Sequence, residues 1–302
     1  DMAKSRGLGD VYKRQPYSGP RHQISDETPW NIVDFDISAD QNILAYTVNK
    51  GGIFELVVKR LSNGENLFTP DLPKGQISRL QISPDGQHLG FTLNSARSGQ
   101  GVYALNLTNG AILQWSGSRP YDQAVAPEVI HFPTFDRVKR SSSTAKREIP
   151  AHIYKPNTPG PHPVIIRFHG GPESQWVAGY SDATQYWVQA LNVAVIKPNI
   201  RGSTGYGKHF AALDNERKRE DALKDVGALL DWIETQPDLD ANKVMVQGGS
   251  YGGYMTLASL VHHGTRLRGG INVVGISNFV TFLESTGSFR RELRRAEYGD
   301  ES

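Results

Sequence analysis

The chain has 302 residues, enough for two ordinary domains that each bury a core of their own. Its net charge is only +2, so bulk charge predicts binding neither to nucleic acid nor to a membrane surface. No apolar run reaches the roughly 18 residues that a membrane-spanning helix needs. Cysteine is absent, which excludes disulfides, thiolate nucleophiles and cysteine-based zinc sites, and nothing in the sequence calls for a cofactor. The absence of cysteine does not decide the cellular compartment, which can be the cytoplasm or the periplasm.

Two features of the chain are not expected to carry function. Residues 1–15 (DMAKSRGLGDVYKRQ) show neither a strand nor a helix period, resemble a translated sequencing-adapter junction, and lack the apolar core of a signal peptide. The basic clusters alternate with acids or lie in polar stretches, and we predict that they form solvated faces. These clusters are residues 139–140, 217–219, 290–291 and 294–295.

Residues from about 30 to 118 predict short strands arranged in an internal repeat. Three pairs of segments match in the same order: DISADQ (36–41) with QISPDG (81–86), LAYT (44–47) with LGFT (89–92), and LSNG (61–64) with LTNG (107–110). The period of about 45 residues is the length of one four-stranded propeller blade. We therefore predict that residues 16–120 form about two blades, the last of a β-propeller. A plain antiparallel sheet or sandwich is the alternative.

After residue 120 the pattern changes to alternating apolar strands and helices. A hairpin is predicted from residues 128–132 and 148–154, with an exposed loop at 137–147. The strands that follow are expected at residues 164–168, 193–196, 243–246 and 271–274, and the helices near 181–191, 215–235 and 251–262. Short buried strands joined by helices indicate a parallel sheet, so residues 121–302 are predicted to be an α/β domain.

The motif GGSYG (residues 248–252) lies directly between a predicted strand and a predicted helix. This strand–turn–helix setting is what a nucleophile elbow requires, with small neighbours that let helix and strand approach. Ser250 is therefore the candidate nucleophile of a serine hydrolase. A glycine-rich helix start with a capping serine is the alternative interpretation.

The motif HGGP (residues 169–172) follows the strand at 164–168. In α/β-hydrolases this loop supplies one backbone donor of the oxyanion hole, and the residue after the nucleophile supplies the other. Gly171 and Tyr251 are therefore the candidate donors. His169 is rejected as the general base, since the base follows the nucleophile in chain order in this fold. We expect it to brace the loop.

The motif NIRGSTGYGK (residues 199–208) partly matches the consensus of a phosphate-binding loop, with Gly202, Gly207 and Lys208 at the expected spacing. Position 209 is histidine, where a serine or threonine should ligate Mg²⁺, so we reject the nucleotide interpretation. Together with HGGP and GGSYG, this motif resembles the prolyl oligopeptidase family of serine peptidases. The likeness covers about residues 125–302 and is strongest to the acylaminoacyl-peptidase and dipeptidyl-peptidase-like branches.

The resemblance implies an α/β-hydrolase domain behind a β-propeller, and hydrolysis of short peptides through a Ser-Asp-His triad. It puts the triad acid and histidine well beyond the nucleophile, while the small net charge predicts neither a nucleic-acid nor a membrane partner. After Ser250 the only histidines are His262 and His263, about 18 Å along the following helix, and the only aspartate is Asp300, with no histidine after it. We therefore expect the hydrolase domain to be incomplete at its C-terminal end and this chain alone to be inactive.

Two other functions remain open at this stage. A carboxylesterase could use the same elbow, and would favour esters over peptide amides. A non-catalytic, propeller-containing binding protein could carry a degenerate hydrolase domain, and would lack a triad acid and histidine altogether.

Overall fold

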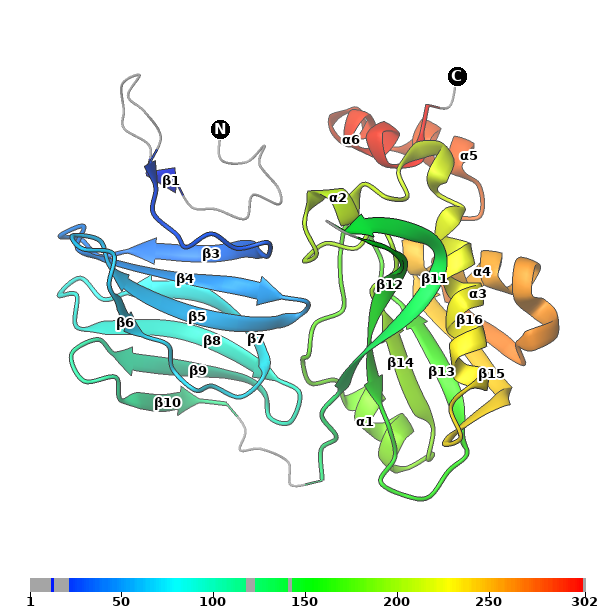
Figure 1. Cartoon of the computed structure of the whole chain (residues 1–302), viewed down its shortest axis with the longest axis horizontal. Helices are drawn as coiled ribbons and strands as arrows, with labels where there is room; N and C mark the ends of the chain where they lie inside the picture. Colours follow the sequence, from blue (N-terminus) through cyan, green and yellow to red (C-terminus); the bar gives the residue numbers. More distant parts are fainter. Residues whose placement is uncertain (1–11, 14–21, 118–122, 141–142, 301–302) are drawn as a thin grey trace. The chain divides into compact units, whose positions relative to one another are not determined.

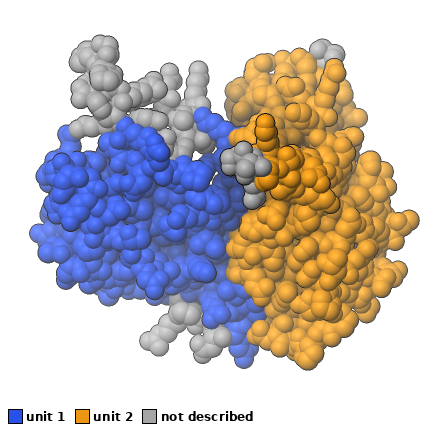
Figure 2. All heavy atoms as spheres, in the orientation of Figure 1, with its two compact units in different colours: residues 1–126, 177–181, 205–208 blue, residues 127–176, 182–204, 209–302 orange. Residues whose placement is uncertain are grey.

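The computed structural model describes residues 12–13, 22–117, 123–140 and 143–300 (Figure 1). The chain divides into two compact units, coloured separately in Figure 2. The first comprises residues 1–126 with the segments 177–181 and 205–208, and the second comprises residues 127–176, 182–204 and 209–302.

The first unit contains two four-stranded antiparallel sheets and a two-stranded ribbon of β1 (Tyr12–Lys13) and β2 (His22–Gln23). In both large sheets the strand order follows the chain, so every connection is a local hairpin. One sheet is β3 (Asn31–Ile37), β4 (Ile43–Lys50), β5 (Ile53–Arg60) and β6 (Asn66–Phe68). The other is β7 (Gly75–Ile82), β8 (His88–Ser95), β9 (Gly99–Asn106) and β10 (Ile112–Ser116).

The sequence repeat reappears as a repeat of hydrogen bonds. The Ser38 hydroxyl donates to Asp40 at 2.5 Å, and the Ser83 hydroxyl donates to Asp85 at 2.5 Å. In both turns the same serine oxygen accepts the backbone N–H at the start of the next strand, at 2.9 and 3.0 Å. The two sheets share one apolar core that includes Phe54, Leu56, Ile77, Leu89 and Phe91.

The second unit is built on a six-stranded mixed sheet in the order β11-β12-β14-β13-β15-β16. Its strands are β11 (Glu128–Arg140), β12 (Ser143–Tyr154), β13 (His162–Phe168), β14 (Ala194–Pro198), β15 (Leu239–Gly249) and β16 (Gly269–Val273). β13 pairs in parallel with β14 and β15, and β15 with β16, as the alternation of strands and helices predicts. β12 pairs with β14 in the antiparallel sense.

Helices and short 3₁₀ turns connect these strands. The helices are α1 (Asp182–Gln189), α2 (Lys208–Ala211), α3 (Asp221–Glu234), α4 (Tyr251–His263), α5 (Phe279–Ser285) and α6 (Ser288–Tyr298), and the 3₁₀ turns are η2 (Glu216–Lys218) and η3 (Gly264–Arg266). α3 buries the apolar face that its sequence predicts, including Val226, Leu230 and Ile233. Within the described ranges, no helix has both the length and the apolarity needed to cross a bilayer.

Two expectations about local structure were wrong. Within the expected loop at residues 137–147, the described residues 137–140 and 143–147 instead form the outer part of the β11–β12 ribbon, in register at Arg137–Lys146 and Val138–Ala145. These strands form without apolar side chains because this part of the ribbon is largely exposed and has no core to cover. The helix expected over 215–235 begins only at Asp221, because Glu216 has φ 55° and a left-handed residue interrupts an α-helix.

Candidate active site

Ser250 sits at the junction between β15 and α4, at the carboxyl edge of the parallel strands. Its φ of 56° and ψ of −120° are a strained conformation for a residue other than glycine. The backbone N–H of Ser250 donates to Val273 at 3.0 Å, and its carbonyl accepts from Gly253 and Tyr254 at the start of the helix. The residue is exposed, and its hydroxyl has no hydrogen-bond partner among the described residues. This is the backbone geometry of a nucleophile elbow.

Gly248 and Gly252, on either side of Ser250, lie where a side chain would collide with neighbouring backbone. A β-carbon at Gly248 would lie 2.8 Å from the Cα of Gly252, and one at Gly252 would lie 2.8 Å from the carbonyl oxygen of His169. Both distances are shorter than any ordinary carbon contact, so the helix reaches its place only because these residues lack side chains. The N-terminus of α4 therefore lies against the start of the HGGP loop.

The HGGP loop lies beside the nucleophile. A β-carbon built on Gly170 would lie 3.6 Å from the Cβ of Ser250, and Gly171 takes a φ of 132° that favours glycine. The carbonyl of Gly170 and the N–H of Gly171 belong to one planar peptide group. Nδ1 of His169 lies 2.7 Å from that carbonyl oxygen, so the imidazole fixes the direction of the Gly171 N–H.

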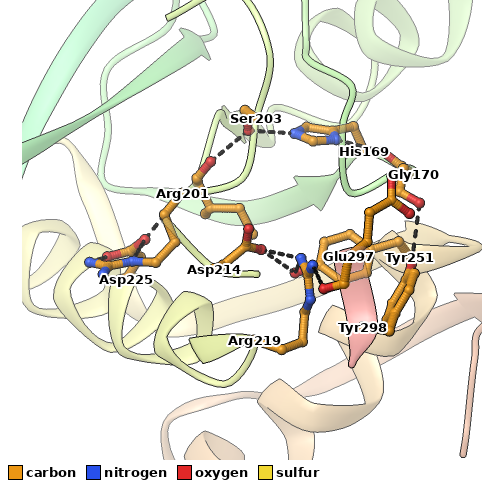
Figure 3. A network of polar contacts seen from close by, with 12 residues as sticks. His169, Gly170, Arg201, Ser203, Asp214, Arg219, Asp225, Tyr251, Glu297 and Tyr298 are labelled. Atoms are coloured by element: carbon orange, nitrogen blue, oxygen red, sulfur yellow. Dashed lines mark hydrogen bonds and ion pairs between the residues drawn. The ribbon is translucent and has the colours of Figure 1, made fainter. Parts of the chain in front are cut away.

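The protonation of His169 follows from its surroundings (Figure 3). The ring is buried, and burial lowers the pKa of His169 to about 4, so it is neutral near pH 7. Nδ1 lies 2.7 Å from the Gly170 carbonyl oxygen, and Nε2 lies 2.8 Å from Oγ of Ser203, whose hydroxyl donates to the Ile200 carbonyl at 2.6 Å. Both ring nitrogens are thus engaged away from Ser250, as a bracing role requires.

The NIRGSTGYGK motif supplies internal supports. Asn199, Arg201 and Ser203 are all buried. The Asn199 amide oxygen accepts the backbone N–H of Trp176 at 2.7 Å, and Arg201 forms an ion pair with Asp225 at 2.7 Å. Since these side chains already have partners inside the protein, the geometry favours a structural role over phosphate binding.

A second polar network surrounds the side chain of Tyr251 (Figure 3). The buried Tyr251 hydroxyl donates to Asp214 at 3.2 Å, and Asp214 forms an ion pair with Arg219. Burial raises the pKa of Asp214 to about 6, while the Arg219 charge opposes that shift. Arg219 also donates to the backbone carbonyl of Glu297 in α6.

Sequence reasoning missed this second network. Arg219 belongs to the basic run 217–219, which we expected to be a solvated face, yet its side chain is only 3% exposed. Arg294, in the run 294–295, is only 17% exposed. The acids that hold these arginines are Asp214 and Glu297, and the contact with Glu297 joins residues 78 positions apart. Charge composition carries no information about such a contact.

No metal centre is evident in the described part of the chain, where no three potential ligands among His, Asp and Glu gather in one place.

This chain is similar in sequence to known peptidases. Residues 179–302 match the family model of the prolyl oligopeptidase family. Dipeptidyl aminopeptidase BIII of Pseudoxanthomonas mexicana is 34% identical over 125 residues, which are 41% of this chain and 18% of that protein. The uncharacterized peptidase YuxL of Bacillus subtilis strain 168 is 29% identical over 217 residues, covering 70% of this chain and 32% of that protein. The chain thus spans less than a third of the length of these relatives.

Solved structures match over nearly the whole chain. A puromycin hydrolase superposes with a TM-score of 0.84 at 21% identity, covering 96% of this chain and 45% of that one. An acylaminoacyl peptidase of Pyrococcus horikoshii gives a TM-score of 0.74 at 21% identity, covering 96% and 44%. The structural likeness establishes the fold, and the family match and the three motifs together confirm that this chain is related to the serine peptidases of the prolyl oligopeptidase family.

Proposed function

We propose that the whole protein hydrolyses short peptides with Ser250 as its nucleophile. The observation that carries this proposal is the strained, exposed Ser250 beside a loop whose Gly171 N–H is held in direction by His169. The Ser250 oxygen attacks the scissile carbonyl carbon while its proton passes to a general base. The carbonyl oxygen becomes an oxyanion, which the N–H groups of Gly171 and Tyr251 stabilise. As the carbonyl re-forms, the general base returns the proton to the leaving amine, and the acyl-serine that remains is hydrolysed by water.

The general base is not one of the described histidines near this site. The ring of His169 is held by Gly170 and Ser203, and Nε2 of His263 lies 3.1 Å from the Leu223 carbonyl oxygen. A serine hydroxyl without a base remains protonated and is a weak nucleophile. We therefore propose that the triad acid and histidine are supplied by other parts of the whole protein, and that the 302-residue chain alone has no meaningful peptidase activity.

The two four-stranded sheets of the first unit are proposed to be propeller blades. The support is their identical strand order, their repeated serine–aspartate turns and their spacing of about 45 residues. With them we propose residues 16–120 as the blade region and residues 121–302 as a hydrolase domain that the missing triad residues would complete. The adapter-like character expected of residues 1–15 lies, apart from Tyr12–Lys13 of β1, outside the described residues. A propeller before the active site would restrict access to short, flexible peptides.

Peptide amides are proposed as substrates because the relatives carry the names dipeptidyl aminopeptidase and acylamino-acid-releasing enzyme. The test compares aminoacyl p-nitroanilides with p-nitrophenyl esters on the whole protein, its Ser250→Ala variant and the control Ser288→Ala. We expect Ser250→Ala to lose at least about a thousandfold in kcat for the anilide, and the exposed Ser288→Ala to match the unmodified protein. Turnover of esters alone would favour a carboxylesterase, and unchanged turnover by Ser250→Ala would overturn the proposal.

A further inference from the structure

Helix α6 contacts the HGGP loop at the peptide group that follows Gly171. Nη1 of Arg294 donates to the carbonyl of Gly171 at 3.1 Å, and the Tyr298 hydroxyl donates to the same oxygen at 3.2 Å. Arg294 and Tyr298 are four residues apart, so they lie on one face of the helix. Gly171 is thereby fixed on both flanks, since His169 holds the peptide before it and α6 holds the peptide after it.

The same helix is connected to the other proposed oxyanion donor. The Glu297 carboxylate forms an ion pair with Arg294, and the Glu297 backbone carbonyl accepts from Arg219. Arg219 forms an ion pair with Asp214, which accepts the hydroxyl proton of Tyr251. A continuous set of contacts therefore joins Gly171 to Tyr251 through α6.

Burial makes this network rigid. The side chains of Arg219, Asp214 and Glu297 are 3%, 0% and 4% exposed. The Arg219 guanidinium also lies over the rings of Tyr251 and Tyr298, 5.3 and 4.9 Å from their centroids. Buried ion pairs add little net stability, because desolvation offsets their attraction, but removing one partner is strongly unfavourable. Such a network is better suited to holding groups at a fixed spacing than to stabilising the fold.

We propose that Arg294 and Tyr298 are positioning residues for the peptidase reaction. They hold Gly171 and, through Glu297, Arg219 and Asp214, also Tyr251 at the spacing that the oxyanion needs. This inference rests on the proposed function. Donors aimed at the developing charge act mainly in the transition state, so loosening them lowers kcat and leaves ground-state binding largely unchanged.

The test uses Tyr298→Phe and Arg294→Met in the whole protein, with Arg294→Lys as a conservative variant. We expect kcat for the anilide to fall about tenfold in the first two, with KM within about twofold, and a partial recovery in Arg294→Lys. A peptide aldehyde, which forms a tetrahedral adduct with an oxyanion, should lose affinity by the same factor as kcat. Arg290→Met removes the same charge from an exposed site on α6 and should change neither value.

Thermal unfolding monitored by circular dichroism identifies any variant that is not folded at the assay temperature, and Tyr298→Phe keeps the buried ring in place. The proposal is overturned when the unmodified protein is active and folded Tyr298→Phe and Arg294→Met keep its kcat, or when KM rises while aldehyde affinity stays constant. Failure of the proposed function looks different, because the unmodified protein itself would then show no Ser250-dependent hydrolysis.

Discussion

Nδ1 of His169 lies 2.7 Å from the carbonyl oxygen of Gly170, in the peptide group that carries the Gly171 N–H. Nε2 of the same ring is held by Ser203, 34 residues further along the chain. The HGGP and NIRGSTGYGK motifs are therefore in direct contact, through His169 of the first and Ser203 of the second. This contact gives the joint presence of the two motifs a physical reason, because a residue of one holds a residue of the other.

The buried His169 makes stability depend on pH. Its pKa of about 4 lies below the usual value of 6.5, so between these values the unfolded chain binds a proton that the folded chain does not. The free energy of unfolding therefore falls as the pH decreases from about 6.5 towards 4, by up to about 3 kcal/mol. The variant His169→Asn cannot titrate, so its melting temperature should approach that of the unmodified protein as the pH falls from 7.5 to 4.5. A difference that is constant over this range would contradict the prediction.

Gly248→Ala tests the packing of the elbow. The new β-carbon would fall within 2.8 Å of the Gly252 backbone, so α4 or β15 must shift, at a cost of about 1–3 kcal/mol or more. Gly264→Ala is the matched control, because its φ of −56° is helical and no atom lies within 4 Å of the added carbon. We expect a lower melting temperature for Gly248→Ala, and an equal or slightly higher one for Gly264→Ala. Equal melting temperatures for the two variants would show that the elbow is not tightly packed.

Lys197 is a buried cation that the proposed reaction does not use. Its side chain lies on β14, 4.6 Å from the ring centroid of Tyr154 and 4.9 Å from that of Trp176, and the residue is 2% exposed. Burial, with a smaller contribution from the Arg167 charge, lowers the pKa of Lys197 to about 7. The unfolded chain keeps this proton up to about pH 10, so stability should rise with pH from about 7 to 10.

Lys197→Met removes that dependence. Removing the buried charge should raise the free energy of unfolding at pH 7 by about 1–4 kcal/mol. The lost cation–π attraction of about 1–2 kcal/mol reduces this gain. The advantage of the variant should shrink as the pH rises towards 10. Lys243→Met, at a side chain that is 65% exposed, serves as the control and should change little. A Lys197→Met variant less stable than the unmodified protein at pH 7 would show that the aromatic rings hold a fully charged lysine.

The order of strands and helices could be predicted because its signals are local. Apolar runs mark β13 and β14, and the spacing of Val226, Leu230 and Ile233 marks α3. The elbow at Ser250 could be predicted because glycines at fixed positions are required by the close approach of strand and helix.

The supports of the site could not be predicted, because they depend on long-range contacts. Arg294 reaches the Gly171 carbonyl across 123 positions, and Arg219 lies in a basic run whose composition suggests a solvated surface. Only the folded chain brings Asp214 and the Glu297 carbonyl to this guanidinium.

Covalent labelling tests most directly whether Ser250 is the nucleophile. A fluorophosphonate probe bonds to an activated serine oxygen and releases fluoride, so the modified residue can be located by mass spectrometry of digested protein. In the whole protein we expect the label on the peptide containing Ser250, and we expect no label on the Ser250→Ala variant. A label on another serine, or equal labelling of Ser250→Ala, would contradict it.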